Sequence, residues 1–170
     1  MSMPERRRRP RTDAGEGVEP PSLDSLRGRA FALLARREHS RAELEERLRA
    51  TGADVGQIAL VLQELEDRNL QSDSRFAEAF VRSRVLRGQG PRVIAAELRL
   101  RGVDPALAVA ALEAADTDWR ASATELRRRR FGEAPPADAR ERARQMRFLQ
   151  YRGFSGEQIR QALGGGCEPD

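Results

Sequence analysis

The pattern of apolar and polar positions divides most of the chain into short amphipathic helices. From Gly90 to Leu112 (GPRVIAAELRLRGVDPALAVAAL), apolar residues recur every three or four positions, which is the period of one helix face. Gly90 and Pro91 are typical of a helix start, and Gly102 of the left-handed residue that ends a helix. Asp104 can cap the segment that follows. The stretch therefore predicts a helix, a glycine stop and a second helix.

This pair of helices recurs along the chain. Three segments of 22 residues, which begin at positions 41, 91 and 142, align without a gap at offsets of 50 and 51 residues. The alignment places Gly52, Gly102 and Gly153 at one position, where each predicts the end of a helix. Three copies at a nearly constant period indicate a repeat protein, in which each unit buries its apolar face against a neighbour.

A further helix precedes each pair. We expect Asp73 to cap this helix in the second unit, and Asp116 and Trp119 occupy in the third unit the positions of Asp73 and Phe76. Trp119 is therefore interpreted as a packing anchor and not as a platform for stacking bases. The predicted fold is all-α: an elongated, curved array of three tandem three-helix repeats, each resembling a helix-turn-helix. The predicted units are residues 23–71, 72–115 and 116–163, flanked by a disordered Arg- and Pro-rich tail (1–22) and a flexible tail (164–170).

The composition adds a charge asymmetry. All 31 basic residues are arginines, and we attribute the absence of lysine to genomic composition bias. The second unit has seven arginines against five acidic residues and the third has eleven against seven, whereas the first has eight against nine. The basic excess in the second and third units indicates an acidic protein or a phosphate backbone as partner. The single cysteine, Cys167, fits a reducing cytoplasm, and no apolar run approaches the ~20 residues that span a bilayer.

The residue types do not favour an enzyme. There is no nucleotide-binding GxxxxGK[ST] loop, and one Cys and one His cannot assemble a metal site, so we expect no cofactor, metal or catalytic residue. His39 stands at a predicted helix end, which favours a surface or helix-terminal position over a general base. Two non-enzymatic functions remain: a helix-turn-helix module that acts directly on DNA, or a scaffold that docks on a larger assembly. Residues 104–115 contain no arginine, which disfavours the DNA reader.

Some arginines are harder to place on a solvent face. Arg84 lies one turn after Phe80, close to the buried stripe, and either bridges the repeats or faces a partner. The consecutive residues Arg127 to Arg130 span most of a helix circumference, so some of them must meet another element or a partner. Favourable interaction with the helix C-terminus is the alternative explanation for this run.

The middle unit carries a pair of motifs that resembles a known family. Residues 73–84 read D-x-x-FA-x-x-FV-x-x-R, and residues 90–103 read GP-x-x-I-x-x-EL-x-x-RGV. These motifs resemble the RecX family of recombination regulators, and the similarity extends from about Leu26 to Leu163. The tails lie outside it.

The resemblance implies a cytoplasmic bacterial protein that binds RecA recombinase and its filament on single-stranded DNA. It implies inhibition of ATP hydrolysis, strand exchange and coprotease function, with no catalytic residues. Joined to the charge count, it suggests that a monomeric curved array occupies the filament groove, adds weak direct DNA binding, and blocks filament growth or promotes disassembly. The candidate partner-binding residues are Arg82, Arg84, Arg87, Arg92, Arg99, Arg101, Arg127, Arg128, Arg129, Arg130, Arg140, Arg144 and Arg147.

Overall fold

The computed structural model of the protein describes residues 20–164, so the predictions for the two tails fall almost entirely outside the described residues. All regular structure within this range is helical, as the sequence predicts. The helices are α1 (Leu23–Leu34), α2 (Arg41–Arg49), α3 (Val55–Asp67), α4 (Asp73–Leu86), α5 (Pro91–Leu100), α6 (Pro105–Ala114), α7 (Trp119–Phe131), α8 (Ala139–Tyr151) and α9 (Gly156–Ala162).

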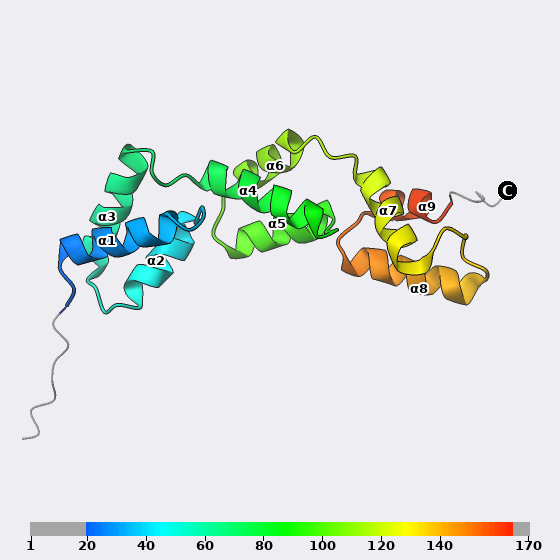
Figure 1. The fold of residues 1–170 in the computed structure, drawn as a ribbon, viewed down its shortest axis with the longest axis horizontal. Coiled ribbons are helices and arrows are strands. Elements are labelled where there is room, and N and C mark those ends of the chain that lie inside the picture. The colour runs from blue at the N-terminus through cyan, green and yellow to red at the C-terminus, as the bar shows by residue number, and fades with distance from the viewer. Residues whose placement is uncertain (1–19, 165–170) are drawn as a thin grey trace, which may run out of the picture.

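These helices form three units that follow one another along the long axis of the molecule (Figure 1). Helices α1–α3, α4–α6 and α7–α9 each enclose a separate cluster of buried apolar side chains. In every well-packed pair of helices, both helices belong to the same unit. The prediction of an elongated array of three-helix repeats is therefore confirmed.

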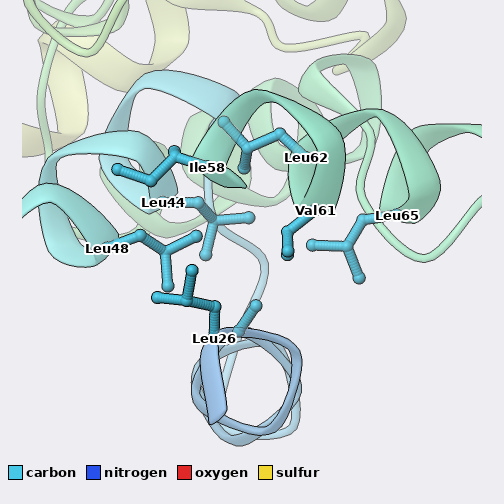
Figure 2. Packing of buried hydrophobic residues seen from close by; sticks show 8 residues of the cluster. Leu26, Leu44, Leu48, Ile58, Val61, Leu62 and Leu65 are labelled. Carbon is cyan, nitrogen blue, oxygen red and sulfur yellow. The ribbon is translucent and has the colours of Figure 1, made fainter. Parts of the chain in front are cut away.

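The core of the first unit shows how the apolar pattern builds a unit (Figure 2). Leu44 and Leu48 lie one turn apart on α2, and Ile58 and Leu62 lie one turn apart on α3, so each pair points to the same side of its helix. Leu26 of α1 closes the cluster. Burying one such side chain contributes roughly 1.5–3 kcal/mol relative to leaving it exposed.

The second and third cores are joined by Trp119. Its ring is partly buried and packs against both clusters of apolar side chains. The interpretation of Trp119 as a packing anchor is therefore confirmed.

Two predicted helix starts are wrong. The N-cap of α4 is Ser72, whose hydroxyl accepts the Arg75 N–H at 3.3 Å, and Asp73 is the first helical residue. The N-cap of α7 is Asp118, so Trp119 begins the helix instead of lying a turn inside it. In both places the sequence offers three consecutive capping residues, 72–74 and 116–118, so local preference alone does not fix which one caps the helix.

The three aligned glycines end their helices as predicted. Gly52, Gly102 and Gly153 have φ of 78°, 74° and 94°, the left-handed region that an L side chain rarely adopts. Each follows the middle helix of its unit, which is α2, α5 or α8.

The middle helices meet end to end at the junctions between units. The C-terminal end of α8 meets the N-terminal end of α5, where the Gly90 N–H donates to the Arg152 carbonyl at 2.7 Å. The C-terminal end of α5 meets the N-terminal end of α2, where the Ser40 hydroxyl donates to the Arg101 carbonyl at 2.7 Å. Each junction brings the partial negative charge of one helix end to the partial positive charge of another, which is favourable.

Candidate protein-binding surface

The structure places two candidate arginines inside the junction between the first and second units. The Arg84 and Arg101 guanidiniums lie 4.3 and 4.6 Å from the centre of the Phe80 ring. Arg84 Nε donates to Glu97 at 2.9 Å, and Arg101 pairs with Glu97 at 3.6 Å and with Glu43 of the first unit at 3.4 Å. Arg101 therefore bridges the two units, and Arg84 orders the ring and carboxylate beside it.

Arg127 is part of the interior of the third unit, with 4% of its surface exposed. Its guanidinium donates to the Ala134 carbonyl at 2.9 Å, to the Glu133 carbonyl at 3.1 Å and to Gln145 Oε1 at 3.4 Å. These bonds hold the loop of residues 132–138 against α7 and α8. This contact meets the expectation that some residue of the four-arginine run must touch another element.

A second group of candidates is exposed and paired with a nearby carboxylate. Glu141, for example, accepts hydrogen bonds from the Gln145 amide and the Arg144 guanidinium at 2.9 Å each, and these bonds, that of Gln145 first, lower the pKa of Glu141. Surface pairs of this kind contribute about 0–1 kcal/mol, so a stronger partner can displace them. The pairs are Arg82–Glu78 at 3.9 Å, Arg128–Glu133 at 3.2 Å, Arg129–Glu125 at 2.8 Å and Arg144–Glu141 at 2.9 Å.

The third group forms no ion pair within the part of the chain that the structure describes. These arginines are exposed and, among residues 20–164, have no carboxylate oxygen within the 4.0 Å of an ion pair. These candidates lie in the second and third units, where the basic excess falls, and the first unit has exposed arginines of the same kind in Arg29 and Arg36. The group consists of Arg87, Arg92, Arg99, Arg130, Arg140 and Arg147.

Two members of this third group border a groove between α5 and α6. Arg92 and Arg99 stand two helical turns apart, and between them the groove has a floor that includes Ala95, Ala96 and Val103. Its volume is about 380 Å³. The sequence predicts these arginines as contacts but does not predict the groove, and the signal that could have predicted it is the pair of alanines, Ala95 and Ala96, between Arg92 and Arg99.

The helix that would read DNA in a helix-turn-helix does not have suitable side chains. The exposed residues of α6 include Ala106, Val109, Ala110 and Glu113, which cannot pair with phosphates or donate to base edges. In the third unit, α9 exposes Arg160 together with one acidic residue, Glu157. The arginines lie instead on the helices that precede these.

Two further properties of the described range concern membranes and metals. Between residues 20 and 164, no helix is both long enough and apolar enough to cross a bilayer. The same range has no group of three or more His, Cys, Asp or Glu side chains that could hold a metal ion.

The fold and surface define a class of protein: a tandem array of three helix-turn-helix-like units with a basic excess on the second and third. Three family models match in the same order, RecX, first three-helix domain (residues 27–65), RecX, second three-helix domain (72–112), and RecX, third three-helix domain (116–163). The chain belongs to the RecX family of regulatory proteins.

Individual relatives agree with this assignment. The chain is 50% identical to regulatory protein RecX of Halorhodospira halophila over 147 residues, 86% of this chain and 91% of that protein. It is 52% identical to regulatory protein RecX of Chromohalobacter salexigens over 134 residues, 79% of this chain and 88% of that protein. The crystal structure of RecX from Lactobacillus salivarius superposes with a TM-score of 0.72 at 23% identity, over 84% of this chain and 95% of that one, which shows a shared fold.

Proposed function

We propose that this chain is a non-catalytic regulator that binds RecA recombinase and its filament on single-stranded DNA and inhibits ATP hydrolysis, strand exchange and coprotease function. Membership of the RecX family supports a regulatory role, and RecA is the target that the sequence resemblance implies. The proposal requires the protein to act in the cytoplasm, where RecA filaments form.

The observation that carries the proposal is the basic excess of the second and third units. They hold seven and eleven arginines against five and seven acidic residues, and six of the candidate arginines, among them Arg92 and Arg99, are exposed without a carboxylate partner in the described range. A filament offers the same subunit surface repeatedly, so a row of units can contact neighbouring subunits at once. Simultaneous contacts raise the overall affinity by about 10²- to 10⁴-fold over a single contact when the geometry permits both.

The proposed mechanism is occupation of the filament groove. An array seated along the groove covers surface that duplex DNA and other clients of the filament would use. Contacts that bridge neighbouring subunits also bias the filament against adding further subunits, which blocks growth or promotes disassembly. Arg84, Arg101 and Arg127 serve this function indirectly, because their guanidiniums hold the units in shape.

The test is the rate of RecA ATP hydrolysis on single-stranded DNA, measured with and without this protein. Inhibition that reaches its maximum with less than one copy per RecA subunit is expected. No inhibition together with no filament binding contradicts the proposal. Binding to naked DNA across a salt series separates the alternative: weak, steeply salt-dependent binding fits the regulator, and a tight, sequence-selective complex fits a DNA reader.

A matched pair of variants tests the location of the charge. Arg140→Gln with Arg147→Gln removes two exposed, uncompensated charges from the third unit, and Arg29→Gln with Arg36→Gln removes two such charges from the first. The first change is expected to weaken filament binding about 3- to 10-fold at low salt, and the second to leave it unchanged. Equal losses from both would show that only total charge matters.

A further inference from the structure

We propose that the groove between α5 and α6 is a docking site for a protein segment that is both apolar and acidic. An apolar side chain of the segment rests on the alanine floor, and two of its carboxylates bind Arg92 and Arg99. This inference rests on the proposed function and makes it more specific, because it assigns one partner contact to one groove of the middle unit.

The groove has the shape and surroundings of a binding site. Its volume of about 380 Å³ lies in the range of ~300–1,000 Å³ typical of ligand pockets. Val103 and Ala108 in its floor are buried, whereas Val109 on the α6 side is 54% exposed. Leu100, one turn after Ala96 on α5, is 83% exposed. A floor of small side chains flanked by exposed larger ones leaves apolar surface for a partner to cover.

In the first unit, longer side chains occupy the positions that correspond to the alanine floor of the groove. At the repeat offset of 50 residues, Ala95 and Ala96 correspond to Glu45 and Glu46, and Arg99 corresponds to Arg49. Arg49 forms an ion pair with Glu45 one turn earlier on α2. The first unit therefore neutralises with Glu45 the charge that the middle unit leaves unpaired at Arg99.

The third unit also has longer side chains at these positions, but it lacks the counterpart of Arg99. At the offset of 51 residues, Met146 and Arg147 replace the two alanines, and Gln150 replaces Arg99. Long side chains thus occupy the places where the middle unit has methyl groups. Of the three described units, the middle one combines a floor of small residues with two uncompensated cations.

The chemistry of the groove selects a protein segment over a nucleic acid. Two guanidiniums two turns apart, about 10 Å along the helix, suit carboxylates at a similar separation on one side of a partner helix or loop. A single strand of nucleic acid needs a continuous line of cations and aromatic rings on which its bases stack. Alanine, valine and proline side chains supply neither, and they favour an aliphatic side chain.

The repeat itself provides the variant that tests this inference. Ala95→Glu with Ala96→Glu copies the first unit, so the fold has already accepted these residues at this position, and each new carboxylate lies one turn from Arg99 or Arg92. We expect binding to RecA filaments to fall at least 10-fold, with circular dichroism and the melting temperature unchanged. The reciprocal change, Glu45→Ala with Glu46→Ala, is expected to leave filament binding unchanged.

A second variant covers the case in which the glutamates impair folding. Arg92→Gln with Arg99→Gln alters two exposed side chains without filling the groove and is expected to weaken binding by a similar factor. If the wild-type protein does not bind filaments at all, the proposed function fails. If the wild-type protein binds and both groove variants bind equally well, the docking site alone is disproved.

The identity of the occupant is tested with the same variants. Naked single-stranded DNA is titrated with the wild-type protein and with the Ala95→Glu, Ala96→Glu variant, and the oligomeric state of both is measured over a range of concentrations. A loss of DNA binding equal to the loss of filament binding would place nucleic acid in the groove. Self-association that the glutamates abolish would place a second copy there. Either result overturns the proposal, which expects neither.

Discussion

The two junctions between units bring together equivalent parts of the repeat but use different bonds. Between the second and third units, backbone meets backbone: the Gly90 N–H donates to the Arg152 carbonyl at 2.7 Å, and the Arg92 N–H donates to the Gly153 carbonyl at 3.1 Å. Between the first and second units, side chains make the contacts. The Ser40 hydroxyl donates to the Arg101 carbonyl, and within residues 20–164 no hydrogen bond joins two backbone groups across this junction.

The difference follows from the residue at the start of the middle helix. A Cβ atom on Gly90 would lie 2.5 Å from the Gly153 carbonyl carbon, so the close approach of the two chains requires glycine. Ser40 carries a side chain at the equivalent position, and that side chain supplies the hydrogen bond. At this repeat position, the junction between the second and third units requires Gly90, which has no side chain. The junction between the first and second units instead uses the side chain of Ser40.

The largest expected effect comes from Gly153→Ala. Gly153 is left-handed, and a Cβ atom there would lie 2.6 Å from the Val93 nitrogen. We expect a left-handed cost of about 1 kcal/mol and a further ~1–3 kcal/mol from overpacking the junction. Urea unfolding measures the total, and hydrogen exchange at the Gly90 and Arg92 amides shows whether the junction opens.

Gly52→Ala is the matched control. Gly52 has the same repeat position and a φ of 78°, but a Cβ atom added there would meet no other part of the protein within 4 Å. Its substitution should show the left-handed cost alone. Equal losses for the two variants would mean that the glycine contact contributes nothing to the junction.

Ser40→Ala is expected to have the next largest effect. Ser40 is fully buried, accepts the Glu43 N–H at 3.1 Å and donates to the Arg101 carbonyl. Its loss should lower the free energy of unfolding by about 1–2 kcal/mol, since both a helix cap and a buried bond across the junction disappear. Ser22→Ala removes an exposed cap from α1 and should cost less. Equal effects would show that the junction bond adds no stability.

Much of the fold could be predicted from the sequence because its signals are local. Helix period, glycine stops and capping residues each depend on neighbours within four positions, and Gly52, Gly102 and Gly153 end their helices as expected. The second role of Gly153, close packing against Val93, depends on a residue 60 positions away and has no local signal.

Two helix starts, those of α2 and α9, have the Ser-x-x-Glu/Gln spacing of a capping box, and they show the same limit. Ser155 and Gln158 form the complete reciprocal box that their spacing allows. Ser40 and Glu43 have that spacing too, but the Glu43 carboxylate instead pairs with Arg37 at 2.8 Å and with Arg101 at 3.4 Å. A partner from another unit competes with the local motif.

The candidate surface was predicted less well than the fold. The sequence sets Arg84 apart from the solvent face but groups it with Arg92, Arg99 and Arg101 as a partner contact, and the structure divides the four between the junction and the groove. The sequence predicts His39 at the surface or at a helix end, and it stands at a helix end, directly before the N-cap of α2, where it is buried with 4% of the residue exposed. Helical periodicity gives the face of a residue, but the neighbouring unit decides whether that face is covered.

A smaller, salt-dependent loss of stability is expected only at the junction between the first and second units (the first junction). Arg75 of the second unit donates to Glu38 of the first at 3.0 Å and to Asn69 Oδ1 at 2.7 Å. Arg75→Gln should lower the free energy of unfolding by about 0.5 kcal/mol in dilute buffer and less in salt of about 0.5 M, because both charges are partly exposed and screened.

Arg120→Gln is the control for that ion pair. Arg120 pairs with Glu157 inside the third unit, where both side chains are more exposed. Hydrogen exchange of α2 amides, measured with rising salt, should respond to Arg75→Gln and not to Arg120→Gln. A salt response of α2 that is unaltered by Arg75→Gln would assign the sensitivity to another pair.

The smallest effect is a pH dependence that only the first junction can show. Burial lowers the pKa of His39, and the positive charges of Arg37 and Arg47 act in the same direction, while the Arg37 carbonyl and Glu43 oppose it. The His39 carbonyl accepts a hydrogen bond from Gln71 Nε2 at 3.2 Å, which ties the residue to the segment entering the second unit.

The sign follows from linkage. In the unfolded chain His39 binds a proton near pH 6.5, whereas the lowered pKa in the folded chain disfavours protonation. The free energy of unfolding is therefore highest above pH 6.5 and falls as the pH drops toward the folded pKa. Unfolding of the wild-type protein at pH 7.5 and 5.5 should show this loss, and His39→Asn should reduce it. Hydrogen exchange at the backbone amide of Gln71 should rise at pH 5.5 relative to its intrinsic rate at that pH. Exchange at the backbone amide of Gly90 should not rise. A parallel rise at Gly90 would mean that the two junctions open together, because His39 is the only histidine in the chain.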